Sequence, residues 1–254
     1  MSIDMYSISH YLAQLLDVSS FDDIVPNGLQ IEGTREIRRI ACAVTASLYA
    51  IDEACRKEAD ILLVHHGLFF KQGISTLQGV LRRRVAHLMG SGIHLLAYHL
   101  PLDAHIEVGN AWPQAQRFGM TDLKPFGEYS GKMIGVRGTF ANPTSGKKLY
   151  NALQNHWGTR GLYLGNDDTK EVRTCAFVSG NGHRFLQEAL DAKVDCFING
   201  TVDDRTWHVV RESEIQFMAF GHFITEKSGV QLLGQHLAER YGLEHFFIDE
   251  QNPF

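Results

Sequence analysis

The 254-residue chain has little cysteine, with only 4 cysteines, and none of them forms a Cys-x-x-Cys pair. A structural zinc site is usually closed and rich in cysteine, so this class of site is not expected. The chain also lacks any run of about 18 apolar residues, and it does not begin with a basic segment followed by an apolar one. We therefore expect a soluble cytoplasmic protein with reduced thiols and no membrane partner.

A positive net charge is also missing, because the formal net charge is −5 at pH 7. A protein of this sign does not bind phosphate backbones through its overall charge. Nucleic acid is therefore not indicated as a partner, although a local basic patch stays open. The chain does have 44% apolar residues and enough length for one large domain or two small ones.

The most informative stretch is 59–67, in which four apolar residues end in His65, His66 and Gly67. Such an apolar run is typical of a strand buried on both faces of a parallel sheet, and these sheets bind ligands at the carboxyl ends of their strands. Neighbouring residues on a regular strand point to opposite faces. His65 and His66 can therefore serve one compact site only where the strand is already breaking. We expect such a break here, supplied by Gly67. The alternative is a chance pair of histidines in a turn.

Strands alternate with amphipathic helices along much of the chain, which predicts an α/β fold. The pattern of apolar residues predicts helices over 8–16, 48–55, 77–88 and 145–156, and strands over 39–45, 61–64, 93–98 and 133–140. Ser47 is expected to cap the second helix. We expect a turn at 26–28 and a connection containing glycine and serine at 73–75. The rest of 111–170 gives few signals.

The second half of the chain repeats the first. The runs 174–178, 194–200 and 215–220 resemble 41–45, 59–65 and 93–98. From Cys42 to Asp60 is 18 residues, and from Cys175 to Asp195 is 20. Apolar strands with a central alanine are common, so a chance alignment is the alternative, but the agreement in order and spacing favours a repeat. We predict two intertwined, duplicated α/β repeats, residues 1–125 and 126–254, with mixed, largely parallel sheets flanked by helices.

Each repeat has a histidine after its third strand and a carboxylate four residues later. These residues are His99 with Asp103, and His222 with Glu226. His222 and Glu226 share one face if the segment is helical. His65, His66, Asp103, His222 and Glu226 are enough ligands for two divalent ions about 3.5–4 Å apart. Imidazole and carboxylate suit Zn²⁺, Mn²⁺ or Fe²⁺.

His99 is the candidate catalytic residue. A role as a proton shuttle or as a partner of the ligands is favoured over direct ligation, because imidazole titrates near neutral pH. Direct ligation by His99 stays the alternative.

Six motifs occur in order along the chain: Pro26-Asn27-Gly28-Leu29-Gln30, Leu63-Val64-His65-His66-Gly67, Tyr98-His99-x-x-Leu102-Asp103 through Gly109-Asn110, Ser179-Gly180-Asn181-Gly182, Asp195 through Gly200, and Gly221-His222-x-x-x-Glu226. Over nearly the whole chain they resemble the Nif-three-like family, whose bacterial members are often named GTP cyclohydrolase I type II homologues. The resemblance implies a duplicated α/β fold, the same five metal ligands, a dinuclear site and a toroidal homohexamer.

For function, the resemblance implies a dinuclear metal-dependent hydrolase acting on a nucleotide or a related phosphorylated or heterocyclic substrate, with damaged nucleotides among the substrates proposed. The alternative, from another class, is a non-catalytic binding or scaffold protein that its metal ions stabilise. Two positions depart from the family pattern. Thr201 stands after Gly200 where the family often has glutamate, and Asn181 stands where it often has a glycine. The first departure concerns the catalytic arrangement and not the five ligands.

Overall fold

The structure is a computed structural model that describes residues 4–71 and 76–254. The predicted connection at 73–75 lies outside these residues. The chain forms two compact units, unit 1 from Met1–Gly109 with Lys227–Gln251 and unit 2 from Asn110–Glu226 with Asn252–Phe254. Packing therefore divides the chain at other positions than the predicted boundary between repeats, and that boundary stays a prediction about the sequence.

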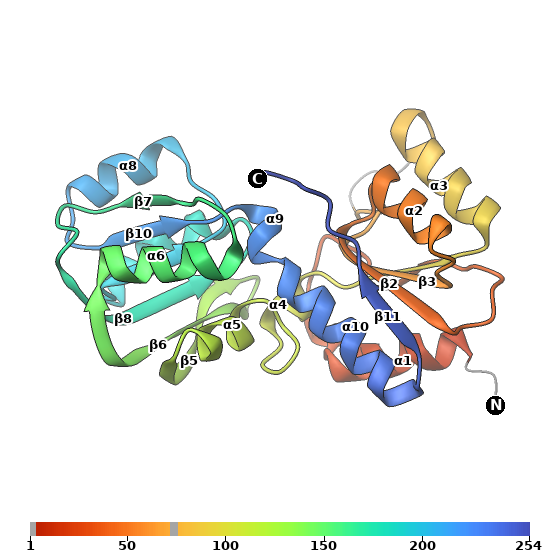
Figure 1. The fold of residues 1–254 in the computed structure, drawn as a ribbon, viewed down its shortest axis with the longest axis horizontal. Helices are drawn as coiled ribbons and strands as arrows, with labels where there is room; N and C mark the ends of the chain where they lie inside the picture. The colour runs from red at the N-terminus through yellow and green to blue at the C-terminus, as the bar shows by residue number, and fades with distance from the viewer. Residues whose placement is uncertain (1–3, 72–75) are drawn as a thin grey trace. The chain divides into compact units, whose positions relative to one another are not determined.

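Unit 1 is built around one sheet. Its strands are β1 (Gly28–Ile31), β2 (Arg39–Thr45), β3 (Ile61–His66), β4 (His94–Ala97) and β11 (Glu244–Phe247). Its helices are α1 (Met5–Leu15), η1 (Val18–Ser20), α2 (Leu48–Arg56), α3 (Gly79–Ser91), α4 (Leu100–Ala104) and α10 (Lys227–Tyr241). The strand order is β1-β4-β3-β2-β11, and all neighbours are parallel except β1 and β4. Helices α2 and α3 cover one face, and α1 and α10 cover the other (Figure 1).

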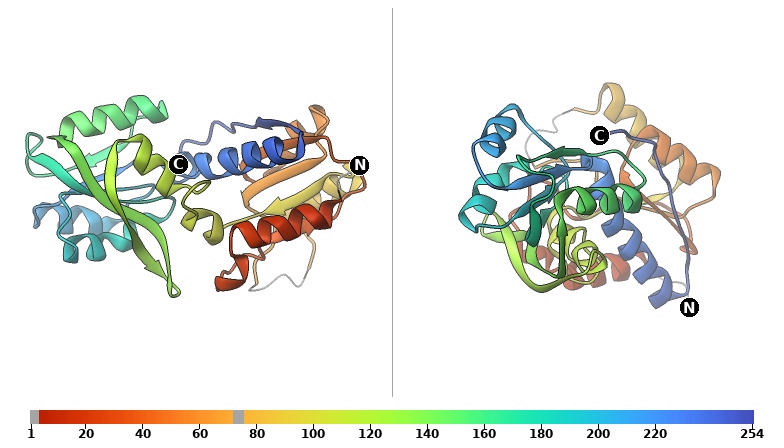
Figure 2. Two further views of the ribbon diagram at one scale, coloured as in Figure 1. Left: turned by 90° about the horizontal axis from the view of Figure 1, so that it is seen from below. Right: turned by 60° about the vertical axis from the view of Figure 1, so that its left-hand side comes forward.

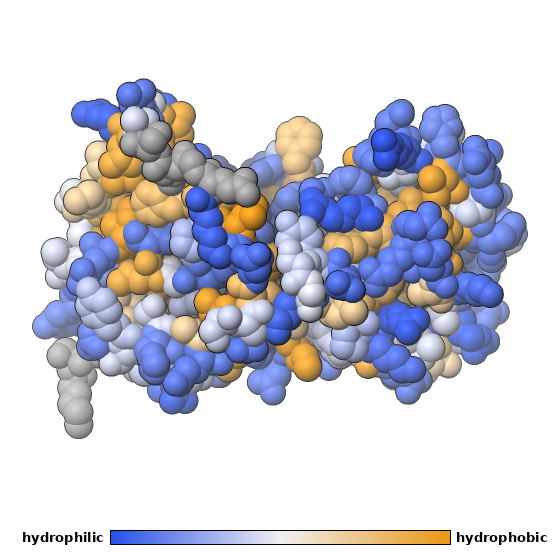
Figure 3. Space-filling view, turned by 180° about the vertical axis from the view of Figure 1, so that it is seen from behind, coloured by the Kyte–Doolittle hydropathy of each residue, from blue (hydrophilic) through white to orange (hydrophobic). Residues whose placement is uncertain are grey.

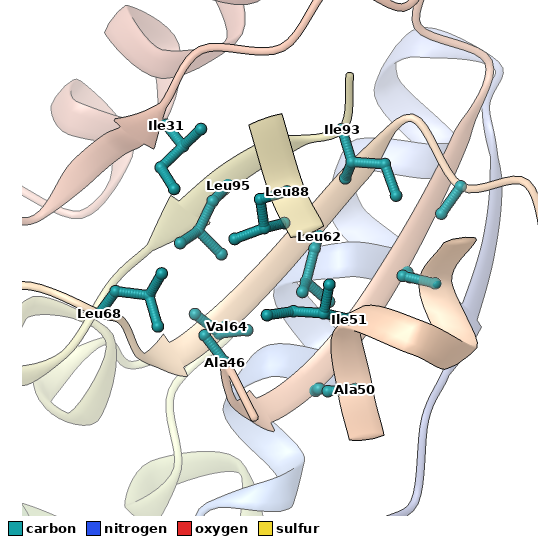
Figure 4. Close-up of a cluster of buried hydrophobic side chains, with 14 of the residues drawn as sticks. Ile31, Ala46, Ala50, Ile51, Leu62, Val64, Leu68, Leu88, Ile93 and Leu95 are labelled. Atoms are coloured by element: carbon teal, nitrogen blue, oxygen red, sulfur yellow. The ribbon is translucent and has the colours of Figure 1, made fainter. Parts of the chain in front are cut away.

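The core of unit 1 lies between the sheet and the helices α2 and α3. Leu62, Val64 and Leu95 project from the strands towards Ile51 of α2 and Leu88 of α3 (Figure 4). Each such side chain contributes about 1.5–3 kcal/mol when it is fully buried. All four apolar residues of β3 are fully buried, which confirms the prediction of a strand covered on both faces.

Unit 2 is built around a second sheet. Its strands are β5 (Met120–Tyr129), β6 (Lys132–Ser145), β7 (Leu162–Leu164), β8 (Glu171–Val178), β9 (Cys196–Asn199) and β10 (Gln216–Ala219). Its helices are α5 (Ala111–Arg117), α6 (Gly146–Trp157), η2 (Gly182–Phe185), α7 (Leu186–Asp191), α8 (Asp204–Arg211) and α9 (His222–Thr225). The strand order is β5-β6-β8-β9-β10-β7. In the left view of Figure 2, α6 lies on one side of these strands, and α7 and α8 lie on the other.

The two sheets place equivalent strands at equivalent positions. Strands β2, β3 and β4 are adjacent and parallel, as are β8, β9 and β10, and each set is followed by an antiparallel edge strand, β1 or β7. The two aspartates that the sequence pairs also have the same role. Asp60 accepts hydrogen bonds from two consecutive backbone N–H groups at the start of β2, and Asp195 accepts from two consecutive ones within β8, at distances of 2.8–3.0 Å. The predicted duplication is therefore visible in both topology and contacts.

The ends of the helices show where local sequence signals were right and wrong. Ser47 caps α2, because its Oγ accepts a hydrogen bond from the Ala50 N–H at 3.0 Å. Helix α1 begins at Met5, before the predicted start, because the Asp4 carboxylate accepts from the Ser7 N–H at 2.9 Å. The helix predicted from residue 77 begins at Gly79.

Figure 3 shows one face of the molecule, on which hydrophilic residues predominate and hydrophobic ones reach the surface in several places. The exposed large apolar side chains include Met89 of α3 and Trp207 of α8. Over residues 4–71 and 76–254, no helix combines the length and the hydropathy needed to cross a membrane.

Candidate metal centre

Three histidines meet at the carboxyl ends of β3 and β4 in unit 1. Strand β3 continues through His66, so the strand does not break before the histidine pair, and the regular pairing ends only at Gly67. Even so, the His65 ring centroid lies 4.8 Å from that of His66 and 5.0 Å from that of His99. One ring nitrogen from each of the three lies within 4.8 Å of the others. The three imidazoles therefore form a candidate metal-binding group.

Asp103 joins this group from α4, which begins directly after β4. Its Oδ2 atom lies 3.5 Å from Nε2 of His65, and both side chains are buried. Pro101 stands in the first turn of α4, where its fixed φ favours the start of a helix. The short helix returns the chain to the strand ends, so a residue four positions after His99 reaches the same group.

The Nδ1 atoms of His65 and His66 are held by groups of the same sheet. His65 donates from Nδ1 to the Tyr98 carbonyl at 2.9 Å. Nδ1 of His66 lies 3.2 Å from the hydroxyl oxygen of Thr45, on the neighbouring strand β2. A metal-ligating histidine usually binds through one ring nitrogen and makes a hydrogen bond through the other. These contacts therefore make Nε2 the nitrogen that each ring can offer to a cation.

His99 is held by Asp23, a buried carboxylate that the sequence did not single out. Asp23 accepts from Nδ1 of His99 at 2.9 Å, from the backbone N–H groups of Leu100 and Val25 at 3.0 and 3.1 Å, and from the Asn27 side chain at 3.0 Å. Burial would raise the pKa of Asp23, but the hydrogen bond and charge of His99, with help from Asn27 and Val25, lower it to about 2. Asp23 is therefore ionised at neutral pH.

Asn27 connects the segment before β1 to this network. The turn predicted at 26–28 is misplaced, because the chain bends at 24–25 and Gly28 already belongs to β1. The Asn27 side-chain oxygen accepts from the backbone N–H of His99 at 2.7 Å, and its amide nitrogen donates to Asp23. This segment therefore positions both the backbone and the ring of His99. The turn motif was the one sequence signal that could have led to Asp23, which lies four residues before Asn27.

In unit 2, His222 begins α9 and Glu226 follows its last residue. Nε2 of His222 lies 3.0 Å from Oε1 of Glu226. Glu226 is buried, whereas the side chain of His222 is partly exposed. The structure thus brings together the pair that the sequence predicted from its four-residue spacing.

Two glycines make room for this pair. Gly180 has a φ of +56°, and a Cβ atom there would collide with Oε1 of Glu226 and lie 3.1 Å from Nε2 of His222. A Cβ atom at Gly200 would lie 2.9 Å from the Cα atom of His222. Gly180 is therefore required both for its backbone conformation and for space. The sequence predicted neither requirement.

The two departures from the family pattern contact each other in unit 2. The Thr201 hydroxyl lies within hydrogen-bond distance of the Asn181 side-chain oxygen, at 3.2 Å, and of Nδ1 of His183, at 2.7 Å. Asn181 has a φ of −78°, so a residue other than glycine fits there without strain. A neutral polar group thus stands where the family often has a carboxylate.

The candidate residues therefore fall into two groups. Unit 1 holds His65, His66, His99 and Asp103, and unit 2 holds His222 and Glu226. That the five predicted ligands form one dinuclear site stays a prediction. The donor set itself fits a metal, because it joins imidazoles with carboxylates and includes no thiolate, which is the chemistry that Zn²⁺, Mn²⁺ and Fe²⁺ accept.

Comparison with known families agrees with the predicted resemblance. The sequence model described as Duf34/NIF3 (NGG1p interacting factor 3) matches residues 3–253. The chain belongs to the Duf34/NIF3 family. A relative from Yersinia pestis named "GTP cyclohydrolase 1 type 2 homolog" is 40% identical over 238 residues, which cover 94% of each chain. A Pseudomonas aeruginosa protein of the same name is 37% identical over 253 residues and is covered, like this chain, to 100%.

Solved structures show the same fold. The structure of protein ybgI, whose function is described as unknown, matches with a TM-score of 0.93 and 34% identity over 99% of this chain and 100% of that one. TTHA1606 from Thermus thermophilus matches with a TM-score of 0.90 and 33% identity over the same shares. The α/β fold predicted for this Duf34/NIF3 protein is therefore confirmed.

Proposed function

We propose that this Duf34/NIF3 protein is a metal-dependent hydrolase acting on a nucleotide or a related phosphorylated or heterocyclic substrate. The observation that carries the proposal is the group of three imidazoles and Asp103 at the ends of β3 and β4. In each imidazole a hydrogen-bond partner within unit 1 holds Nδ1. The names of the relatives from Yersinia pestis and Pseudomonas aeruginosa support a nucleotide as the substrate class.

Two divalent ions, of zinc, iron or manganese, would be held by His65, His66, Asp103, His222 and Glu226. Bound ions of this kind lower the pKa of water and polarise a phosphoryl group or a ring carbon. The ligands of unit 1 come from β3 and α4, whose backbones are fixed by the sheet and by the turn after β4. Rigid placement of this kind limits the reorganisation needed when a substrate binds.

His99 would move the proton. Its Nδ1 is committed to Asp23, so Nε2 is the atom that accepts a proton from the attacking water and returns it to the leaving group. Asp23 keeps a negative charge beside the ring, which stabilises the imidazolium during the transfer.

The assembly and location that the resemblance implies belong to the same proposal. We propose a toroidal homohexamer in the cytoplasm with a small-molecule substrate. Light scattering of the purified chain should give six times the protomer mass, and a monomeric mass would contradict the assembly without affecting the site.

The central experiment is a metal-supplemented activity screen against nucleotides and phosphoesters, with His66→Ala beside wild type. Wild type should carry about two ions per chain by elemental analysis and should turn over at least one substrate. His66→Ala should lose turnover while its far-UV circular dichroism is unchanged. A metal-loaded wild-type protein that is inert towards the whole panel would overturn the proposal.

Glu226→Gln tests whether unit 2 contributes a ligand. The change removes a negative charge, so metal affinity should fall roughly tenfold or more if Glu226 binds a dication. Glu188→Gln, in the first turn of α7, is the matched control and should leave metal content unchanged. If Glu226 were only a carboxylate at a helix end, its replacement would lower the free energy of unfolding by a few tenths to about 1 kcal/mol and would leave the metal content unchanged.

The second candidate function is a scaffold that its metal ions stabilise. It is favoured by the distribution of the predicted ligands over both units. In that case a chelator should lower the melting temperature strongly in a protein that has no turnover. Turnover that disappears in His66→Ala with the fold intact would contradict it.

A further inference from the structure

The Asp23 carboxylate has all of its acceptor positions occupied. Oδ1 accepts from the Val25 N–H and from Nδ1 of His99, and Oδ2 accepts from the Leu100 N–H and the Asn27 amide. An ionised carboxylate offers about four lone-pair positions and no donor. Because Asp23 is almost completely buried, water does not compete for these positions. The group that faces Oδ1 from His99 must therefore be an N–H.

This requirement fixes the tautomer of His99. A neutral imidazole carries one proton, so a proton on Nδ1 makes Nε2 an acceptor. The His99 ring lies 5.0 Å from that of His65 and 5.8 Å from that of His66, and one ring nitrogen of each residue lies within 4.8 Å of the others. Because Nδ1 of His99 is engaged by Asp23, Nε2 is the nitrogen left for the group of three imidazoles.

The rest of the network prevents His99 from turning away. Its backbone N–H donates to Asn27 at 2.7 Å, and the next backbone N–H, that of Leu100, donates to Asp23 at 3.0 Å. The same carboxylate therefore holds the ring and the start of α4. A rotation of the ring would leave Oδ1 with the Val25 N–H as its one remaining donor among those named above, and the loss of a hydrogen bond to a buried charged group costs about 1–3 kcal/mol.

We propose that Asp23 is a positioning residue that keeps His99 in the Nδ1–H tautomer and so presents the Nε2 lone pair to the histidine group. The tautomer of His99 does not depend on whether the protein is an enzyme, but its use in proton transfer rests on the proposed function. By analogy with the aspartate of serine protease triads, loss of the charge should leave the geometry in place and permit the wrong tautomer.

The test is long-range ¹H–¹⁵N correlation spectroscopy of histidine side chains in the full, zinc-loaded chain at mildly alkaline pH, with His99 assigned through His99→Gln. Wild type should show a protonated Nδ1 and an unprotonated Nε2. Asp23→Asn should lose this pattern or mix it with the other tautomer. Asp52→Asn is the matched control, because Asp52 lies 2.8 Å from Nδ1 of His87 in an exposed pair, and it should leave the His99 signals unchanged.

Kinetics complete the test. In Asp23→Asn, kcat should fall roughly 100-fold or more with KM and bound zinc within twofold of wild type, since catalysis by a positioned base contributes about 10²–10⁴. A wild-type His99 that is protonated on Nε2 would overturn the proposal, and this measurement needs a folded variant for the assignment of the signal and not for the result itself. An unchanged tautomer in Asp23→Asn would also overturn it. A changed tautomer with unchanged kcat would support the positioning role of Asp23 and contradict the role given to His99 in the proposed function.

Discussion

Units 1 and 2 have the same arrangement of central strands but place different residues at the strand ends. In unit 1, β3 ends in His65 and His66, whereas in unit 2 the equivalent strand β9 is followed by Gly200. Unit 1 fills its strand ends with imidazoles held through Nδ1. Unit 2 has glycines at Gly180 and Gly200, and His222 and Glu226 of the segment after β10 lie against them. The two units therefore share the arrangement of their central strands and differ in the side chains at the strand ends.

The largest effect is expected from adding a side chain at Gly180 in unit 2. Gly180→Ala should lower the free energy of unfolding by about 2–5 kcal/mol, the sum of a left-handed backbone and a collision with Glu226. Bound metal should fall as well. Gly158→Ala is the control, because Gly158 has a φ of +64° with nothing within 4 Å of an added Cβ, and it should cost about 1–2 kcal/mol. Urea unfolding and elemental analysis measure both effects, and equal costs for the two variants would refute the crowding argument.

Unit 1 holds His99 through the ionised carboxylate of Asp23. The free energy of unfolding should therefore depend on pH. The pKa of Asp23 is about 2 in the folded chain against an ordinary value of 3.8, so the unfolded chain binds this proton more tightly. The stabilisation is fully present above about pH 4 and is lost as the pH falls through about 2, and it amounts to about 2 kcal/mol. The difference in unfolding free energy between wild type and Asp23→Asn should narrow by this amount between about pH 5 and pH 2. Urea titrations with chelator present measure it, and a constant difference would contradict the assignment.

The likeness of the units can be tested at Asp60 and Asp195. Replacing either aspartate by alanine leaves two backbone N–H groups without their acceptor, so each change should cost about 1–3 kcal/mol. The Asp195 variant should be slightly the more costly, because Asp195 also accepts from the Thr174 hydroxyl at 2.8 Å. Chemical denaturation at neutral pH measures both, with the exposed Asp191→Ala as control. A neutral effect at one site alone would mean that the repeats share topology without sharing this contact.

The smallest effect concerns the polar pair that distinguishes this chain from the family pattern. A double-mutant cycle of Asn181→Ala and Thr201→Ala should give a coupling energy of about 0.5–1 kcal/mol, because one hydrogen bond joins the two side chains. Denaturation of the two single variants and the double variant measures the coupling. Strict additivity would show that the hydrogen bond between the two side chains contributes no coupling energy to stability.

The central strands of both sheets could be predicted because residues buried on both faces give unbroken apolar runs. The edge strands could not. β7 and β11 are three and four residues long, and β5 carries Pro125 and an irregular register after Thr121. Short or interrupted strands of mixed polarity have no clear period, and only pairing with a neighbouring strand reveals them.

The candidate site shows the same limit. His65, His66 and His222 could be predicted because each stands at or just after the end of a recognisable strand. Asp23 could not, since its partner His99 lies 76 residues away and no local pattern joins them. Gly180 could not either, because its requirement comes from the carboxylate that faces it in the folded unit and not from its neighbours in sequence.

The position of β11 has a consequence for synthesis on the ribosome. This last strand pairs with β2, and Glu244 lies opposite Arg39, 205 residues earlier in the chain. Residues 110–226 leave the ribosome before α10 and β11, so nearly all of unit 2 is complete while the sheet of unit 1 still lacks an edge strand and the helix that covers part of one face. Contacts over such a distance are also slow to form. The sheet of unit 1, whose first strands are made early, therefore cannot be completed until residues 244–247 have been synthesised.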